Sequence, residues 1–225
     1  MRVYLTRPSQ RRHNSSLAIV AAALFLFLQR PLAQTQTSAL PAAEDSHEGL
    51  TVSVQPWTDP ARYKERFAKK SPFTAGIAAV YVTFQNDSGD TLRVNLERIR
   101  LLVTYGEDSR QQLTPLSPGD VADRMLSGNT TDPTARRSRI PLPIGKPKVG
   151  RTKEWTELEK AARDAGMPGG MVAPHSKLQG LLYFDMADQF DLLSTAHMYV
   201  PEVLSLEKNK TLFYFDVDLA KRVTR

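Results

Sequence analysis

The sequence has 225 residues, no cysteine and a formal net charge of +6, with 30 Lys and Arg against 24 Asp and Glu. The lack of cysteine excludes disulfides, thiol catalysis, zinc–thiolate sites, iron–sulfur clusters and a lipid-modified cysteine anchor. Five of the basic residues and no acid lie in residues 1–33, so the remainder carries 25 basic and 24 acidic residues. This near balance argues against nucleic acid or an anionic membrane as the partner.

Residues 1–33 have the pattern of a secretory signal peptide. Four arginines precede the unbroken apolar run Leu17 to Leu28, and Pro31-Leu32-Ala33 follows it. A charged start, an apolar stretch and a small-residue exit predict export, with cleavage after Ala33. Thr37-Ser38-Ala39 offers a second cleavage site. We therefore expect a periplasmic or secreted protein, with no membrane insertion after cleavage.

Two other readings of this leader stay open. One is an uncleaved anchor, although the apolar run of 12 residues is shorter than the roughly 20 that a spanning helix needs. The other is twin-arginine export, suggested by Arg11-Arg12. His13-Asn14-Ser15 follow that pair where the twin-arginine signal has apolar residues, so the general secretory route is preferred.

The chain after the leader begins with a predicted tether and a first strand. Residues 34–48 contain Gln, Thr, Ala, Pro and acidic residues without an apolar period, which predicts a flexible tether. Residues 49–221 are then expected to form one domain. Residues 49–54 alternate with period 2 and predict a strand. Asp59 before Pro60 is typical of a helix start, so a short helix is expected from Ala61 to Phe67.

The clearest strand signal lies at residues 75–84, which are rich in β-branched and aromatic residues. Asn86 to Asp90 form a turn cluster, and residues 91–96 alternate apolar with polar before the apolar run Ile99 to Val103. Two strands around a Gly-containing turn predict an antiparallel hairpin. The alternation predicts a sheet with one packed and one solvated face.

Residues 117–166 are expected to form a helical insertion. Ser117-Pro118-Gly119-Asp120 opens one helix, and a second is predicted from about Glu154 to Ala165. Residues 129–150, between them, are rich in Pro, Gly and Asn and predict an irregular segment. The apolar faces of the two helices are Val121, Ala122, Met125 and Leu126 in the first, and Trp155, Leu158 and Ala162 in the second.

The last third of the chain returns to strands, at 177–184, at 198–206 with an interruption at Pro201, and at 211–219. Strands at this spacing suggest a β-sandwich. The string AVYVTFQNDSGDTLRVNLERIRLLV resembles bacterial exported immunoglobulin-like modules, in which a strand enters an Asn-x-Ser turn. Residues Val172 to Phe184 are similar to their Φ-x-P-G-x-x-x-x-G-Φ-Φ-x-F element, with His175 in place of its glycine. The predicted fold is therefore mainly β, an antiparallel immunoglobulin-like β-sandwich with a short helical insertion.

Motifs for catalysis and cofactor binding are weak. Gly145 to Thr152 resembles a phosphate-binding loop, but Arg151 replaces its lysine and Pro147 removes a backbone donor. No paired-histidine zinc motif occurs, and His47, His175 and His197 are scattered in the chain. Asp185, Asp188 and Asp191 have a spacing that could bind calcium, without the Gly and Glu of an EF-hand loop. We expect no enzyme activity, no cofactor and no metal.

An aromatic set is the main candidate for a contact surface. Its members, which lie among basic residues, are Trp57, Tyr63, Phe67 and Phe73. They could contact a partner, stack on sugar rings, or close the open end of the sandwich. The hypothesis from sequence is a non-enzymatic exported module that works through protein–protein contacts in the cell envelope. The alternative is a carbohydrate- or peptidoglycan-binding module that uses Trp57 and its neighbours.

Overall fold

The structure is a computed structural model that describes residues 42–68, 70–105, 109–127 and 151–221. The predicted signal peptide and Ala33 lie outside these residues. All the elements named below belong to one compact unit, Leu40–Arg225. None of the helices in the described ranges has both the length and the apolar character needed to cross a membrane.

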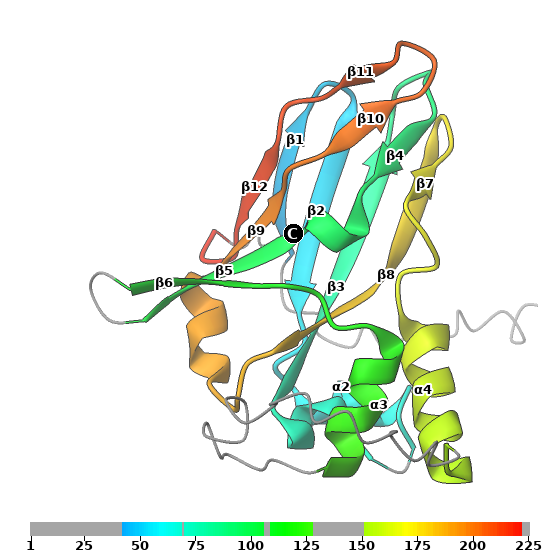
Figure 1. The fold of residues 1–225 in the computed structure, drawn as a ribbon. Helices are drawn as coiled ribbons and strands as arrows, with labels where there is room; N and C mark the ends of the chain where they lie inside the picture. Colours follow the sequence, from blue (N-terminus) through cyan, green and yellow to red (C-terminus); the bar gives the residue numbers. More distant parts are fainter. Residues whose placement is uncertain (1–41, 69, 106–108, 128–150, 222–225) are drawn as a thin grey trace, which may run out of the picture. The chain divides into compact units, whose positions relative to one another are not determined.

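The described residues are mainly β and form three antiparallel four-stranded sheets (Figure 1). Sheet A has the order β1-β2-β3-β8, with strands β1 (Ala43–His47), β2 (Leu50–Pro56), β3 (Ile77–Asn86) and β8 (Ser176–Asp185). The strands at 50–56, 77–86 and 176–185 confirm three predicted strands.

Sheets B and C are built from neighbouring parts of the chain. Sheet B has the order β11-β10-β4-β7 and sheet C the order β12-β9-β5-β6. Three pairs of successive strands are divided between them: β4, β10 and β11 lie in sheet B, and β5, β9 and β12 lie in sheet C. The strands are β4 (Leu92–Val94), β5 (Arg100–Tyr105), β6 (Ser109–Leu113), β7 (Met171–Val172), β9 (His197–Val200), β10 (Val203–Ser205), β11 (Lys210–Thr211) and β12 (Phe215–Asp218).

Helices gather at the end of sheet A where β3 begins and β8 ends (Figure 1). The predicted helix starts are confirmed: the side chain of Asp59 accepts a hydrogen bond from Ala61 N and caps α2 (Pro60–Lys64), which has Pro60 in its first turn. The other helices are η1 (Pro72–Ala75), η2 (Leu96–Arg98), α3 (Pro118–Ser127), α4 (Lys153–Ala165) and η3 (Phe190–Thr195). Trp155, Leu158 and Ala162 are buried on α4, as their spacing predicts.

Two hydrophobic clusters share sheet A. The first core contains Val52, Val80, Phe84 and Phe184 of sheet A together with buried residues of sheets B and C. The second core lies on the other face of the sheet, because neighbouring strand residues point to opposite faces. It contains Ile77, Ala79, Leu181 and Tyr183 of sheet A, Phe67 after α2, and from the helices Tyr63, Val121, Ala122, Met125, Trp155, Leu158 and Ala162.

Part of the predicted tether is wrong. Residues Ala43–His47 form β1, which pairs along its whole length with β2. The two strands are joined by Glu48-Gly49, both with positive φ, 48° and 79°. This is the backbone that a two-residue hairpin turn requires, and Gly supplies one of the two positions without steric cost. Glu-Gly is a weaker hairpin signal than Asn-Gly, so this hairpin was not predicted from the sequence.

The predicted hairpin between residues 75–84 and 91–96 is also wrong. β3 pairs with β2 and β8 in sheet A, whereas β4 pairs with β10 and β7 in sheet B. The turn between them carries the chain from one sheet to another. Asn86, which is fully buried, holds it there: its amide donates to Asp90 O at 2.7 Å and to Ala173 O at 3.0 Å.

Proline and irregular segments divide the later strands. The predicted strand at 198–206 is two strands, β9 in sheet C and β10 in sheet B, separated at Pro201-Glu202. Proline lacks the N–H that would continue the ladder. The predicted strand at 211–219 is divided in the same way into β11 and β12. The helices at 118–127 and 153–165 pack on sheet A, and residues 128–150 lie outside the described residues.

Candidate binding site

The outer face of sheet A is only partly covered by the helices. Beyond the helices, aligned rows of mostly uncharged polar side chains cross β2, β3 and β8, because paired residues share a face. Gln55, Tyr81 and Leu181 form the row nearest the helices, followed by Ser53, Thr83 and Gln179, and then by Thr51, Gln85 and Lys177. These side chains are exposed or half-buried, apart from Leu181.

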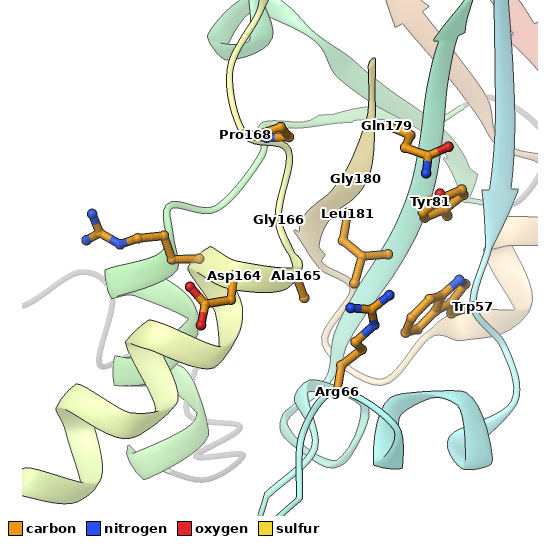
Figure 2. Close-up of a pocket in the computed structure, with 11 residues that line it drawn as sticks. Trp57, Arg66, Tyr81, Asp164, Ala165, Gly166, Pro168, Gln179, Gly180 and Leu181 are labelled. Carbon is orange, nitrogen blue, oxygen red and sulfur yellow. The ribbon is translucent and has the colours of Figure 1, made fainter. Parts of the chain in front are cut away.

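A cleft of about 530 Å³ opens where the helical layer ends on this face (Figure 2). Trp57, Tyr81, Gln179 and Leu181 line one side, and Arg66 reaches between Leu181 and Trp57. Residues from the end of α4 and the segment after it complete the lining: Arg163, Asp164, Ala165, Gly166 and Pro168.

Trp57 is fixed by the sheet and by Tyr63. Its backbone N–H donates to Ala79 O at 2.9 Å, which continues the pairing of β2 with β3 for one residue beyond Pro56. Its ring stands edge-on to the buried Tyr63, at 5.6 Å and 86°. The indole is therefore held in place while part of its surface stays open to the cleft.

Arg66 owes its position to the turn after α2. The backbone N–H groups of Arg66 and Phe67 both donate to Tyr63 O, at 3.1 and 2.7 Å. The hydroxyl of Tyr63 in turn donates to Trp57 O and accepts from Ala79 N, both at 2.9 Å. One buried tyrosine thus sets the spacing of Trp57, Arg66 and β3. Its burial raises its own pKa, so the hydroxyl stays neutral.

The opposite wall, formed by the segment after α4, lies close to β8 because Gly166 and Gly180 have no side chains. Met167 N donates to Leu181 O at 3.1 Å, and Gly166 forms a parallel bridge with Leu181. A Cβ on Gly180 would lie 2.6 Å from Met167 Cα, closer than real side chains come. The segment after α4 can therefore lie beside the strand only because position 180 has no side chain.

The charged residues that line the cleft are Arg66, Arg163 and Asp164. Burial raises the pKa of Tyr81, and the nearby Arg66 charge opposes that rise. Arg163 is paired with Glu159 on the same helix. Within the described part of the chain, Arg66 forms no ion pair. The cleft therefore combines two aromatic rings, an exposed amide and an unpaired cation.

The aromatic set expected to form a contact surface is divided by the structure. Tyr63 and Phe67 are buried in the second core, with 0% and 3% exposure, and cannot meet a partner at the surface. Phe73 is half-buried and stacks on Phe190 at 4.3 Å. Trp57 alone of the four lines the cleft. Arg66 was one of the basic residues noted around this set in the sequence, whereas Tyr81 and Gln179 were missed, although the alternation of β3 and β8 carried their signal.

The predicted acidic and histidine candidates form no group of three that could hold a metal in the described residues. Asp185 accepts from Arg124 at 3.3 Å and from Ala187 N at 3.1 Å. Across the residues that the structure describes, no three His, Asp or Glu side chains are placed to hold a metal. His197 contacts Asp216 at 3.0 Å. His175 has a φ of 51°, the left-handed backbone that a glycine would adopt.

The phosphate-loop candidate, Gly145 to Thr152, lies mostly outside the described residues. Its last two residues have structural roles. Thr152 caps α4 by accepting from Trp155 N at 3.1 Å. The guanidinium of Arg151 lies 4.1 Å from the centre of the Trp155 ring. Both contacts help to fix the start of α4.

Comparisons with known proteins assign no family to this chain. No protein-family model matches it, and no curated protein matches it. Among solved structures, it is similar to a functionally unknown protein from Listeria monocytogenes EGD-e. That likeness has a TM-score of 0.35 and 12% identity, and it covers 80% of this chain and 83% of the other.

Proposed function

We propose that this chain is an exported, non-enzymatic binding module of the cell envelope, periplasmic or secreted, and that it binds a carbohydrate chain at the Trp57 cleft. The observation that carries the proposal is the placement of Trp57 and Tyr81 beside the exposed amide of Gln179, at the end of a polar sheet face. Sugar rings have apolar faces that stack on aromatic rings and hydroxyls that pair with amides and alcohols.

The proposed fold is an immunoglobulin-like β-sandwich. Sheet A would form one layer, and sheets B and C would form the other as two halves of one interrupted sheet. The first core supports this arrangement, because it draws buried residues from all three sheets. The interruptions at η2 and at Pro201-Glu202 fall where β4 passes to β5 and β9 passes to β10.

Carbohydrate is preferred over protein at this surface because of what the face offers. Protein interfaces have apolar, aromatic centres that are closed to water. Here the rows beyond the cleft carry hydroxyls and amides, such as those of Ser53, Thr83 and Gln85. A chain of sugar hydroxyls can exchange its hydrogen bonds with water for bonds with these groups at little cost.

Binding of the full chain to insoluble peptidoglycan and to a panel of polysaccharides tests the proposal. Trp57→Ala and Gln179→Ala are expected to weaken retention, by about tenfold for Trp57→Ala, if stacking contributes about 1.4 kcal/mol. Gln179 is exposed, so its variant leaves the fold intact. Phe213→Ala is the matched control, because Phe213 is 72% exposed and lies outside the cleft. Unchanged binding by both cleft variants contradicts the proposal.

Protein contact is the second candidate, and a separate surface favours it. Phe213 and Tyr214 are 72% and 57% exposed between β11 and β12. Their backbone is fixed, because Phe213 N donates to Glu48 at 2.7 Å and Tyr214 O contacts His47 at 3.2 Å. Rigid, exposed aromatic residues are typical of protein interfaces.

Crosslinking in envelope extracts separates the two candidates. A protein partner at this second surface is expected to be lost in the double variant Phe213→Ala, Tyr214→Ala and retained in Trp57→Ala. A polysaccharide ligand is expected to show the opposite pattern. If a captured protein is lost in neither variant, neither surface holds the partner.

A further inference from the structure

We propose that the Trp57 cleft selects sugar chains that carry carboxylates, with Arg66 as the residue that binds the carboxylate. The inference rests on the proposed carbohydrate-binding function and names its ligand class. It follows from the charged side chains on the outer face of sheet A.

Arg66 is the unpaired cation of the cleft. Two arginines line it, and Arg163 is neutralised by Glu159, while Asp164 adds a second negative charge nearby. Within the described ranges, Arg66 forms neither an ion pair nor a side-chain hydrogen bond with another residue. Arg66 is exposed, so its planar set of donors is free for a ligand, and that geometry matches a carboxylate.

The position of Arg66 strengthens such a contact. Figure 2 shows its guanidinium between Leu181 and Trp57. Tyr81 is half-buried and lines the cleft together with Leu181 and Trp57, so apolar surfaces flank the otherwise exposed Arg66. A charge-assisted hydrogen bond formed against apolar walls is stronger than one formed in water.

A second unpaired cation extends the pattern along the sheet. Lys177 lies on the same face, four residues from Leu181 on β8, and is exposed. Within the described residues it forms no ion pair. Glu44 of β1, which accepts a hydrogen bond from Ser53 at 3.1 Å, also carries its negative charge on this face, but it lies on the opposite edge strand of sheet A from Lys177. Two cations separated by uncharged Ser, Thr and Gln side chains suit a sugar chain with carboxylates at intervals.

A peptide with acidic side chains fits this face less well. A peptide on a sheet face has its backbone N–H and C=O groups to satisfy, which a free sheet edge would do. The cleft lies on the flat of sheet A, and β8 is already bordered there by Met167 and Leu116, which donate to Leu181 O and Tyr183 O. Sugar hydroxyls need no such ladder.

The test compares acidic sugar chains with their own neutralised forms. Oligogalacturonate, alginate oligomers and peptidoglycan fragments are titrated into the full chain by calorimetry, each beside a form with its carboxyls converted to methyl esters or amides. At least one acidic form is expected to bind about tenfold more tightly than its neutral form. The difference is expected to shrink as salt rises from 50 to 500 mM.

Variants assign the preference to Arg66. Arg66→Gln is expected to remove the difference between acidic and neutral forms while retaining the neutral binding. Lys64→Gln is the matched control, because it removes the same charge two residues away and does not line the cleft. Equal binding of acidic and neutral forms overturns the acid preference and leaves the proposed function standing. If neither the acidic nor the neutral form binds, and Trp57→Ala does not change retention on any polysaccharide, both the acid preference and the proposed function are contradicted.

Discussion

The two hydrophobic cores on either side of sheet A are built from different residues. The first core, between the sheets, consists of aliphatic side chains and Phe, such as Val80, Val82 and Phe84. The second core, under the helices, contains the buried tyrosines and tryptophan, Tyr63, Tyr183 and Trp155. Each of these has a hydrogen-bonded polar atom: Tyr183 OH donates to Ala162 O at 3.0 Å, and Trp155 Nε1 donates to Asp123 at 2.6 Å.

The difference indicates that the two cores do different work. A core of aliphatic side chains stabilises by area removed from water, with little directional preference. Buried tyrosine and tryptophan add directional bonds, which fix helices on the sheet in one position. No side-chain polar atom is both buried and unsatisfied in the part of the chain that the structure describes. The second core therefore positions the walls of the cleft, while the first stabilises the fold through burial of apolar surface.

The largest expected effect is on the first core. Phe184→Ala, at a fully buried position, is expected to lower the free energy of unfolding by about 3–5 kcal/mol, because it removes apolar contacts and leaves a cavity. Urea unfolding followed by circular dichroism measures it. Phe67→Ala is the matched deletion in the second core, with a smaller loss expected because the short α2 region can close over the space. An equal or larger loss at Phe67 would reverse the ranking of the cores.

The next effect tests how the helical layer is attached to sheet A. Gly180→Ala is expected to cost about 1–3 kcal/mol, because its Cβ would clash with the backbone of Gly166 and Met167. The same change is expected to weaken ligand binding at the cleft, since it displaces one wall. Gly89→Ala, where a Cβ would meet nothing within 4 Å, is the control for loss of glycine. Matching stabilities for both variants would show that the close approach is unimportant.

A smaller effect separates the polar from the apolar part of the second core. Tyr63→Phe removes a hydroxyl that makes two hydrogen bonds, to Trp57 O and from Ala79 N. The expected loss is about 1–2 kcal/mol. Tyr183→Phe removes a hydroxyl with one hydrogen bond to the protein, to Ala162 O, and is expected to lose about half as much. Denaturant titration of both variants checks the ratio, and a larger loss for Tyr183→Phe would contradict the assignment.

The helices of this fold could be predicted from the sequence because their signals are local. Asp59-Pro60 marked the start of α2, and the spacing of Trp155, Leu158 and Ala162 marked the buried face of α4. Individual strands were recognised for the same reason, since alternation of side chains is also a local property. Strands β1 and β6 lacked such a signal, because β1 has a single buried residue, Ala43, and the Ser-Arg-Gln-Gln sequence of β6 is exposed.

Strand pairing and the cleft could not be predicted, because both depend on contacts that are distant in sequence. The Asn86–Asp90 turn looks like a hairpin, yet Asn86 bonds to Val172 and Ala173, far along the chain. Arg66, Tyr81 and Gln179 meet only once β3 pairs with β8 and α2 packs on their face. The resemblance carried the Asn-x-Ser turn but no information on which sheet each strand enters.

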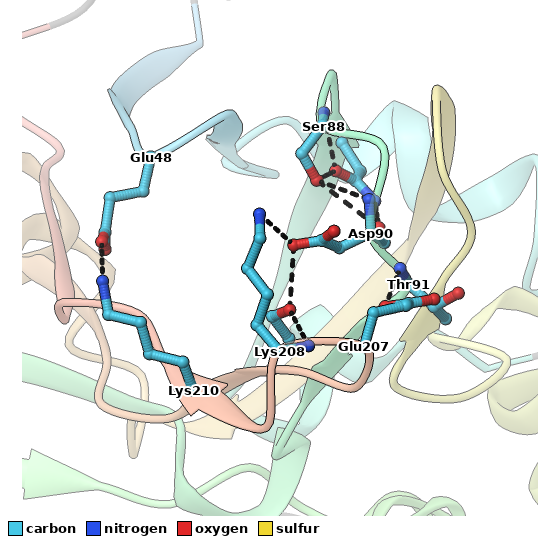
Figure 3. A network of polar contacts seen from close by, with 9 residues as sticks. Glu48, Ser88, Asp90, Thr91, Glu207, Lys208 and Lys210 are labelled. Carbon is cyan, nitrogen blue, oxygen red and sulfur yellow. Dashed lines mark hydrogen bonds and ion pairs between the residues drawn. The ribbon is translucent and has the colours of Figure 1, made fainter.

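The smallest expected effect is the dependence of stability on pH and salt. The carboxylates responsible lie at the end of the sheets far from the second core. Figure 3 shows three carboxylates that hold the Leu206–Lys210 segment against neighbouring turns. The pKa of Glu48 is lowered chiefly by the Phe213 N–H, that of Asp90 by Lys208, and that of Glu207 by Thr91. Each group therefore stabilises the fold above its ordinary pKa, near 4.

This contribution is expected to be lost as the pH falls from about 5 through the lowered pKa values, because the folded protein must then bind protons at a cost. Lys208 has a raised pKa, so its share is lost only as the pH rises above 10. The triple variant Glu48→Gln, Asp90→Asn, Glu207→Gln is expected to lose less stability than the wild type between pH 6 and pH 3 in urea titrations. The gap is expected to narrow at 500 mM salt, because these groups are exposed and screened. Parallel pH profiles for the two proteins would show that the turns are held by packing alone, whereas the Phe184→Ala loss is expected to stay constant across the same pH range.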